Sequence, residues 1–240
     1  MISFAQNFED VVLNRAFKHQ ETGFYVDIGC GGPVINNVTL SLYRNGWHGL
    51  VVDGDSSVLS DYSLDRPRDI VRHAWISSKQ EKRTWVQSDV AGLSRLSAGA
   101  PEDPNDPNTM RVSTKTVSDL LTEEGRTSLD LLKIDCEGAD FEVLRGSALR
   151  RFRPRVVVVE VLNPQAKPTS TVHLTWYMRF HGYKKCLFDG VNIFFCLRTE
   201  KEIAKAISYP ACVLDMPFHR YQQALAMGWV DGDRSDDLPM

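Results

Sequence analysis

Long hydrophobic runs are missing from this sequence of 240 residues. A membrane-spanning helix needs roughly 18–20 consecutive apolar residues, and the longest apolar stretch, VVVVEVL, is interrupted by Glu160. The first ten residues, MISFAQNFED, contain acids and no cationic segment, so we expect no secretory signal there. We therefore expect a protein without a membrane span, located in the cytoplasm.

Basic charge and paired cysteines are also scarce. The net charge is −3, so no basic field favours a nucleic-acid partner. The five cysteines are odd in number and have no C-x-x-C spacing, which argues against a disulfide framework or a zinc site. We expect buried thiols that behave as small apolar side chains in a reducing compartment. They are Cys30, Cys136, Cys186, Cys196 and Cys212.

What the sequence does contain is an alternation of strand-like and helix-like segments that starts at Gly23. Helical patterns cover 36–46 and 139–152. The strand-like runs are continuous and apolar, as in parallel sheets that helices cover on both faces. They lie at 24–28, 49–53, 69–76, 129–135 and 155–162, with shorter extended stretches at 84–88 and 111–117. This pattern predicts an α/β fold with a doubly wound, Rossmann-like sheet.

The end of the predicted sheet differs from its beginning. Asp189-Gly190 separates two apolar runs, YKKCLF and VNIFFCL, and this dipeptide favours a two-residue turn between antiparallel strands. We therefore expect a mostly parallel sheet with an antiparallel terminal strand. The polar, proline-rich stretch 101–108 is a surface loop or a lid. We divide the chain into an N-terminal helical segment (1–22), a main domain (23–198) and a C-terminal helical tail (199–240).

A glycine cluster follows the first predicted strand, in the stretch FYVDIGCGGP. In doubly wound sheets ligands bind beyond the carboxyl ends of the strands, where a glycine turn lets a nucleotide approach the main chain. Asp53 ends the second strand, 53 − 27 = 26 residues after Asp27, near the roughly 20-residue offset of a ribose-binding acid. Asp55 is an alternative for that role. A tight turn beside a surface acid is the simpler interpretation.

The glycine spacing favours S-adenosylmethionine over a dinucleotide. A dinucleotide fingerprint reads G-x-G-x-x-G/A, but here Val34 takes the third position after Pro33. The predicted terminal hairpin is also unusual for dinucleotide folds. A nicotinamide-dependent oxidoreductase remains an alternative, and so does a non-catalytic Rossmann-like binding module.

The sequence resembles the FkbM-type class I methyltransferases. The stretches that carry the resemblance are SFAQNFEDVVLNRAF, GFYVDIGCGGP, LYRNGWHGLVVD, TVSDLL and LDLLKIDCEGADFEVLRG, of which KIDCEGAD is the most specific. The resemblance implies a seven-stranded sheet, S-adenosylmethionine as donor, and O-methylation of a sugar, glycan or secondary metabolite. Two positions depart from the family: Cys30-Gly31 replaces the commoner Ala-Asn, and Asp53-Gly54 replaces Glu-Pro.

Positions in this pattern suggest a set of donor-binding residues. Asp27, Gly29 and Gly31 should line the methionine end, Asp53 should hold the ribose, and Ile76 should lie near adenine. Asp135, at the end of the fourth strand, could bind the ammonium group of the donor. The Q-x-x-E-D signature adds Gln6 and Glu9, which are either lid residues that touch donor or acceptor, or helix-capping groups.

Three carboxylates at or near the ends of adjacent strands are the candidates for chemistry: Asp135, Glu137 and Glu160. They could supply a general base or bind a divalent metal through oxygen. Glu160 could instead form an ion pair with Lys133 or Arg155, and Glu137 could be a first-turn helix acid.

A second candidate base is His173. It shares a predicted helix face with Trp176 and Tyr177, a stripe that more often packs into the core. The sequence identifies neither the acceptor nor the oligomeric state.

Overall fold

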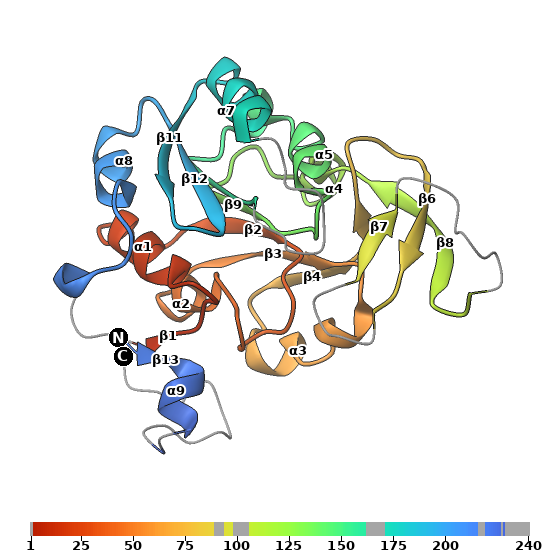
Figure 1. Cartoon of the computed structure of the whole chain (residues 1–240), viewed down its shortest axis with the longest axis horizontal. Helices are drawn as coiled ribbons and strands as arrows, with labels where there is room; N and C mark the ends of the chain where they lie inside the picture. Colours follow the sequence, from red (N-terminus) through yellow and green to blue (C-terminus); the bar gives the residue numbers. More distant parts are fainter. Residues whose placement is uncertain are drawn as a thin grey trace.

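A seven-stranded sheet, in the order β11-β12-β10-β9-β2-β3-β4, forms the centre of the protein (Figure 1). The computed structural model describes residues 2–88, 94–97, 106–161, 171–215, 219–226 and 228. Neighbouring strands from β10 to β4 are parallel, and the chain reverses its winding between β2 and β9. The predicted doubly wound sheet is confirmed. Its strands are β2 (Phe24–Ile28), β3 (His48–Asp53), β4 (Ile70–His73), β9 (Leu131–Ile134), β10 (Val156–Glu160), β11 (Tyr183–Phe188) and β12 (Asn192–Leu197).

The predicted terminal hairpin is also confirmed, because β12 is antiparallel to both β10 and β11. Gly190 has φ +105°, the positive value that the Asp-Gly turn was expected to need. The Asp189 carboxylate accepts hydrogen bonds from the backbone N–H groups of Val191 and Asn192. The reversed strand is the last of the sheet in the chain, but it lies inside the sheet because β11 takes the edge.

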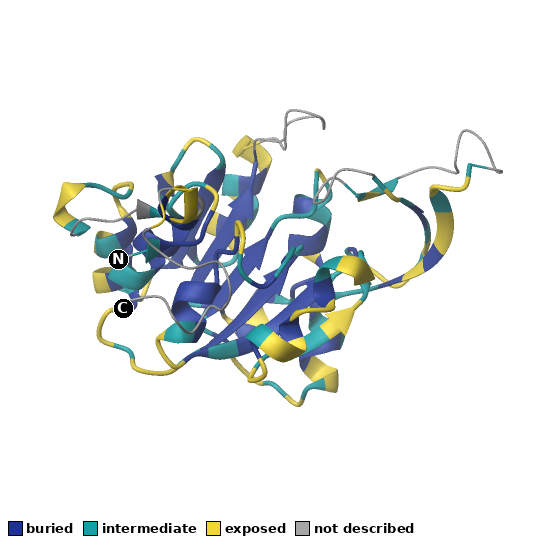
Figure 2. Ribbon diagram, turned by 90° about the horizontal axis from the view of Figure 1, so that it is seen from below, coloured by how far each residue is buried: buried dark blue, intermediate teal, exposed yellow. Residues whose placement is uncertain are grey.

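Helices cover both faces of the sheet, and each face has its own hydrophobic core. Alternate residues of one strand point to opposite cores: Val51 faces one, and Leu50 and Val52 face the other. The strands are buried in the middle of the layers (Figure 2). The helices of the first face are α1 (Glu9–Ala16), α2 (Leu40–Arg44) and α8 (Lys201–Ile207), and those of the second are α4 (Val117–Glu123), α5 (Asp140–Arg145), α6 (Leu149–Phe152) and α7 (Thr171–Phe180).

A second sheet, in the order β5-β8-β6-β7, extends from the end of the main sheet. The sequence predicted one strand over 69–76, but β4 ends at His73 and the chain changes sheet at Ala74. Ala74 N–H still bonds to the Asp53 carbonyl of the main sheet, whereas Ser77 N–H bonds to Lys115 of the second sheet. The four strands are β5 (Trp75–Ile76), β6 (Lys82–Val86), β7 (Arg95–Ser97) and β8 (Thr109–Lys115).

Local signals explain where two of the helices end. Asn37 Oδ1 accepts hydrogen bonds from the N–H groups of Thr39 and Leu40, so it satisfies the start of α2, and Gly46 at φ +95° follows its end. The helix predicted over 139–152 is two helices, because Ala148 adopts φ +46° and interrupts the helical backbone. The remaining helices are a 3-10 helix (Ser56–Leu59), α3 (Tyr62–Asp65), a second 3-10 helix (Val213–Asp215) and α9 (Tyr221–Ala226).

The start of the chain contacts a segment near residue 220. The short strand β1 (Ile2–Ser3) pairs in parallel with β13 (His219–Arg220), and α1 packs against α8. None of the described helices is long and apolar enough to cross a bilayer. The predicted acidic end at 231–237 and most of the predicted loop at 101–108 lie outside the described residues. The division at residues 22 and 198 stays a prediction.

Candidate active site

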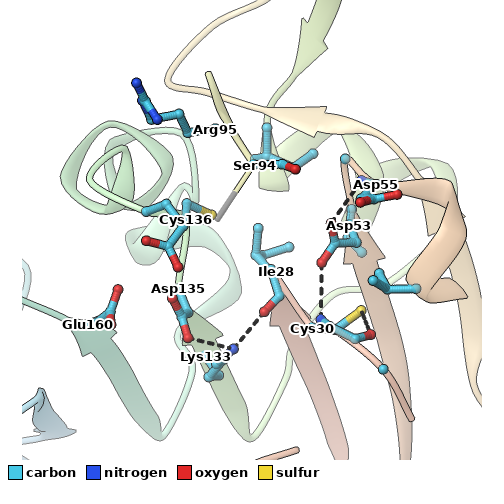
Figure 3. A pocket seen from close by; sticks show the side chains of 18 of the residues that line it. Ile28, Cys30, Asp53, Asp55, Ser94, Arg95, Lys133, Asp135, Cys136 and Glu160 are labelled. Carbon is cyan, nitrogen blue, oxygen red and sulfur yellow. Dashed lines mark hydrogen bonds and ion pairs between the residues drawn. The ribbon is translucent and has the colours of Figure 1, made fainter. Parts of the chain in front are cut away.

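A cavity of about 710 Å³ opens at the carboxyl ends of β2, β3, β9 and β10, and its size suits a small organic ligand. Figure 3 shows its two opposite sides, with Asp53 and Asp55 on one and Asp135 and Glu160 on the other. The second sheet closes the cavity through Trp75 and Ile76 of β5, Trp85 of β6, and Arg95 and Leu96 of β7.

The glycine turn after β2 contains two kinds of glycine. Gly29 has φ +69°, and a Cβ there would lie 1.7 Å from the backbone oxygen of Asp135. The protein's own neighbouring strand therefore requires Gly29. Gly31 (φ +58°) and Gly32 have no atom within 4 Å of a built Cβ, and both line the cavity. The main chain available to a ligand is thus Gly31-Gly32.

Asp53, at the end of β3, organises the cavity wall through both carboxylate oxygens. Its Oδ2 accepts from the Gly31 N–H at 3.0 Å, and its Oδ1 accepts from the Asp55 N–H at 2.9 Å. Burial raises the pKa of Asp53 although both hydrogen bonds act to lower it. Each carboxylate oxygen retains a second lone pair for a ligand hydroxyl. Asp55 also lines the cavity, but its carboxylate already accepts from Ser57 and Gln87.

Asp27 lies beneath the cavity and is not part of its wall, which corrects the expectation that it lines the methionine end. It is fully buried, and its Oδ2 accepts from Thr39 Oγ1 at 2.9 Å. Its Oδ1 lies 3.3 Å from Lys133 Nζ. Lys133, which does line the cavity, also donates to the Gly29 carbonyl at 2.8 Å and lies 3.5 Å from Asp135. Asp27 therefore acts on the cavity through Lys133.

Lys133 was not singled out as a donor-site residue from the sequence. Burial by itself would lower the pKa of Lys133, but the carboxylates of Asp27 and Asp135 outweigh burial and raise that pKa above its ordinary value. Lys133 is therefore a charged ammonium at the base of the cavity. The signal for it lies inside the KIDCEGAD block, where a lysine interrupts the apolar strand β9.

A buried polar network supports the glycine turn from behind. Arg66 is fully buried and donates to Asn37 Oδ1 at 2.7 Å and Thr39 Oγ1 at 3.0 Å, and it pairs with Asp69 at 2.7 Å. Asn37 in turn donates to the Gly32 carbonyl at 2.9 Å. Sequence reasoning missed this network, because its members are separated in the chain and form no recognisable motif.

Three carboxylates converge at the opposite wall: Asp135, Asp140 and Glu160 each present an oxygen, and these oxygens lie within 4.8 Å of one another. Asp140, at the start of α5, accepts from the N–H groups of Cys136 (2.7 Å) and Gly138 (3.0 Å). Glu160 Oε2 is buried without a hydrogen-bond partner among the described residues. Burial, reinforced first by Asp135 and then by Asp140 and Glu137, raises the pKa of Glu160 to about 9.

The predicted trio was Asp135, Glu137 and Glu160. All three line the cavity, but Asp140 replaces Glu137 in the close cluster. Glu137 sits in the turn before α5 with φ +50°, and the acids of the first helical turn are Asp140 and Glu142.

The alternative that Glu160 forms an ion pair with Lys133 or Arg155 is wrong. Within the described residues, Lys133 pairs with Asp27 and Asp135, and Arg155 pairs with Asp130 and Glu200. The charge of Glu160 is therefore not neutralised by either cation.

Comparison with known proteins identifies the family. The family model described as the methyltransferase FkbM domain matches residues 21–185, more than half of the chain. The chain belongs to the FkbM methyltransferase family. The resemblance seen in the sequence is confirmed, and methyltransferase replaces nicotinamide-dependent oxidoreductase as the class of enzyme. No curated protein matches the chain. Human methyltransferase-like protein 13 in complex with SAH is similar at 11% identity and a TM-score of 0.38, covering 86% of this chain and 92% of that one.

The other predicted donor-site residues of this FkbM methyltransferase differ in whether they line the cavity. Gln6 and Ile76 line the cavity, and their contact with the donor stays a prediction. Glu9 does not line it. Its carboxylate accepts from Asn192 Nδ2 and from the Asn7 N–H, both at 2.7 Å, and so joins the N-terminal segment to the terminal hairpin.

The face of α7 that carries His173 does not line the cavity, and of its three residues Tyr177 packs against the core. His173 is exposed, and Trp176 is 68% exposed. The buried residues of this helix are Leu174 and Met178. Tyr177 is half-buried and packs edge-on against Phe141 at 5.4 Å. The structure thus places His173 away from the cavity wall.

Two tryptophans of the FkbM methyltransferase pack over Gly54. A Cβ at Gly54 would lie 2.8 Å from atoms of both Trp75 and Trp85. Both rings line the cavity, with centroids 6.3 Å apart. The absence of a side chain at residue 54, where the family commonly has proline, makes room for these rings. The sequence signal for them was limited to aromatic residues in short extended stretches.

Proposed function

We propose that this methyltransferase transfers the methyl group of S-adenosylmethionine to a hydroxyl oxygen of a sugar, glycan or other small secondary metabolite. The observation that carries the proposal is the pairing of two walls in one cavity. One wall offers open main chain at Gly31 beside the Asp53 carboxylate, and the other offers the carboxylates of Asp135 and Glu160.

The donor fits the cavity in one orientation. Asp53 accepts hydrogen bonds from the ribose hydroxyls, and Trp75 and Ile76 take the adenine side. The methionine end then lies along Gly31 toward Asp135. Sulfonium and ammonium groups are cationic, and the acidic lining of the cavity favours both. A dinucleotide would bring anionic phosphates to the same acids, which is unfavourable.

Methyl transfer needs alignment and removal of one proton. The acceptor oxygen attacks the methyl carbon in line, the carbon–sulfur bond breaks, and S-adenosylhomocysteine leaves as a neutral thioether. The acceptor hydroxyl proton passes to the carboxylate wall, where Asp135, Glu137 and Glu160 lie. Asp135 and Glu160 lie across the cavity from Asp53. In the proposed orientation, the methyl group of the bound donor points toward these carboxylates.

Isothermal titration calorimetry tests the donor. We expect binding of S-adenosylhomocysteine and no heat with NAD, and the reverse result would overturn the proposal. Transfer from methyl-labelled S-adenosylmethionine to a panel of hydroxyl compounds tests the acceptor class. With an acceptor whose only nucleophile is a hydroxyl, a labelled product that resists alkaline hydrolysis is a methyl ether and supports O-methylation of a hydroxyl. Labelling confined to amines, thiols or carboxylates would contradict it.

We also propose that the protein acts in the cytoplasm and that it is a catalytically active enzyme. All five cysteines are free thiols, which suits the reducing cytoplasm. The departure at Cys30-Gly31 keeps the backbone N–H that Asp53 binds, which favours a working donor site over a non-catalytic binding module. Asp135→Ala should abolish transfer while the fold persists by circular dichroism, and unchanged turnover would remove Asp135 from the site.

A further inference from the structure

We propose that Asp135, Asp140 and Glu160 bind one divalent cation of the oxygen-seeking class, such as Mg²⁺, Mn²⁺ or Ca²⁺, in the wall of the cavity. The three side chains come from the end of β9, the start of α5 and the end of β10, so the fold itself brings them together. The role of the cation in transfer rests on the proposed function, but its binding does not.

The geometry of the cluster suits such a cation. Two oxygens bound to the same Ca²⁺ lie at most about 4.6–5.2 Å apart, and about 4.2 Å apart on Mg²⁺, because the metal–oxygen bonds limit them. The three carboxylate oxygens lie within 4.8 Å of one another before any ion draws them in. The donor set contains only oxygen, which selects hard cations over zinc or copper.

An unsatisfied buried oxygen points to the same ligand. Glu160 is only 9% exposed, it lines the cavity, and its Oε2 has no hydrogen-bond partner in the described part of the chain. Buried polar atoms in folded proteins normally have a partner. The groups around Glu160 are themselves carboxylates, those of Asp135, Asp140 and Glu137. A cation bound among these carboxylates would supply the partner that this oxygen lacks.

Among the residues that the structure describes, no ion pair joins a cation to Glu160. Lys133 is held by the Gly29 carbonyl and by Asp27, and its contact with the cluster is with Asp135 at 3.5 Å. Asp140 is held in place by two backbone N–H groups, one on each oxygen, and each oxygen keeps a second lone pair. The site is thus built and oriented before a cation arrives. A bound cation would orient and acidify an acceptor hydroxyl at this wall.

Manganese titration followed by electron paramagnetic resonance tests the site with Mn²⁺ as the probe. We expect one saturable Mn²⁺ per chain, displaced by Mg²⁺ or Ca²⁺. Glu160→Gln should weaken Mn²⁺ binding by at least about tenfold, because it removes a ligand charge without changing the shape of the side chain. Glu137→Gln removes the same charge from the same wall but leaves the cluster intact, and should change binding by less than about threefold.

Absence of saturable binding to the wild type, or equal loss in the two variants, would overturn the site. Thermal unfolding in the presence of a chelator is the control for correct folding. There, Glu160→Gln should unfold at or above the wild-type temperature. Added Mn²⁺ should raise the unfolding temperature of the wild type and of Glu137→Gln, but not of Glu160→Gln. An equal rise in all three would place the ion elsewhere.

Measuring both S-adenosylhomocysteine binding and Mn²⁺ binding on the wild-type protein separates this inference from the proposed function. S-adenosylhomocysteine should bind in the presence of chelator, because Asp53, which binds the Gly31 N–H, lies on the opposite wall. Mn²⁺ binding without S-adenosylhomocysteine binding would contradict the proposed donor and support the cation site. S-adenosylhomocysteine binding without Mn²⁺ binding would contradict the cation site alone.

Discussion

Asp53 Oδ2 accepts a hydrogen bond from the backbone N–H of Gly31 over 3.0 Å. The acid that ends β3 is therefore bound to the glycine turn that follows β2. One hydrogen bond connects the two parts of the expected nucleoside site. Both positions depart from the residues commoner in the family. In this chain the two positions are joined directly by this hydrogen bond.

Asp53→Asn should weaken binding of S-adenosylhomocysteine by about tenfold or more, the equivalent of about 1.4 kcal/mol. The amide keeps one acceptor oxygen but points an NH₂ group at the second N–H donor, so either Gly31 or Asp55 loses its partner. Calorimetry measures the effect. Asp61→Asn is the matched control, because Asp61 lines the same cavity and is exposed, with no bond to the glycine turn. Equal affinity of Asp53→Asn and wild type would refute the role.

Gly29→Ala should lower the free energy of unfolding by about 3 kcal/mol or more, because it combines a left-handed backbone with severe overlap. The added Cβ would lie 1.7 Å from the Asp135 oxygen. Gly32→Ala, three residues on, meets nothing within 4 Å and should be close to wild type. Urea denaturation of both variants makes the comparison. Similar losses at the two glycines would show that the turn as a whole, and not the crossing strand, sets the requirement.

Lys133→Met should destabilise the fold by about 3–5 kcal/mol, because it leaves Asp27 as a buried charge without its cation. Lys184→Met removes an exposed lysine of β11 and should change stability by less than about 0.5 kcal/mol. In the double variant Asp27→Asn/Lys133→Met the buried charge is gone, so a large part of the loss should return. Additive losses in this cycle, measured by denaturant unfolding, would show that the two residues are not coupled.

Stability should fall as the pH rises from about 4.5 to 7, and Glu9 should be one cause. Burial raises the pKa of Glu9 from 4.5 to about 7. Between these values the folded protein keeps a proton that the unfolded chain releases, so raising the pH favours unfolding, by on the order of 3 kcal/mol in total. Glu9→Gln lacks this term. Its stability relative to wild type should therefore be lowest near pH 5 and should improve toward pH 8.

Urea unfolding of both proteins at several pH values measures the difference. Asp10, whose pKa burial raises to about 6, contributes with the same sign in both proteins and cancels in the comparison. Parallel stability curves for wild type and Glu9→Gln across this range would rule out Glu9 as the titrating group.

Tryptophan fluorescence should report the adenine side of the cavity. Trp75 and Trp85 line it, so a bound nucleoside should quench their emission. Trp75→Phe and Trp85→Phe should each reduce the quenching caused by S-adenosylhomocysteine. Trp176→Phe, which removes an exposed indole on α7, should leave it unchanged. Quenching lost with Trp176 alone would move the nucleoside away from the second sheet.

The sequence predicted those parts of the fold that short stretches determine. The strand at 24–28 was placed to the residue, because five successive buried positions define it. The Asp-Gly hairpin followed from two residues. The change of sheet at Ala74 could not be predicted, since it depends on hydrogen bonds to distant segments. The break before α6 could not be predicted either, since alanine does not favour the left-handed backbone that Ala148 adopts.

The candidate site divides in the same way. Asp53, Asp135 and Glu160 end their strands and were found by position, and the cavity brings them together. Asp27 was identified from the sequence, but it does not line the cavity as expected. The pattern of a buried strand does not show whether a polar side chain within it faces a cavity or the interior. Asp140 belongs to the quoted KIDCEGAD block, yet its approach to Glu160 requires the tertiary fold. Arg66 and its partners had no signal at all.

The pairing of β1 with β13 links the first residues of the chain to residues 219 and 220. The Glu9 carboxylate likewise accepts a hydrogen bond from Asn192, which lies far along the chain. During synthesis on a ribosome the amino-terminal segment emerges first, and these partners follow only after the parallel strands of the main sheet. The seam therefore closes only after the parallel strands have emerged, and a nascent chain halted before residue 192 keeps its opening segment available to chaperones.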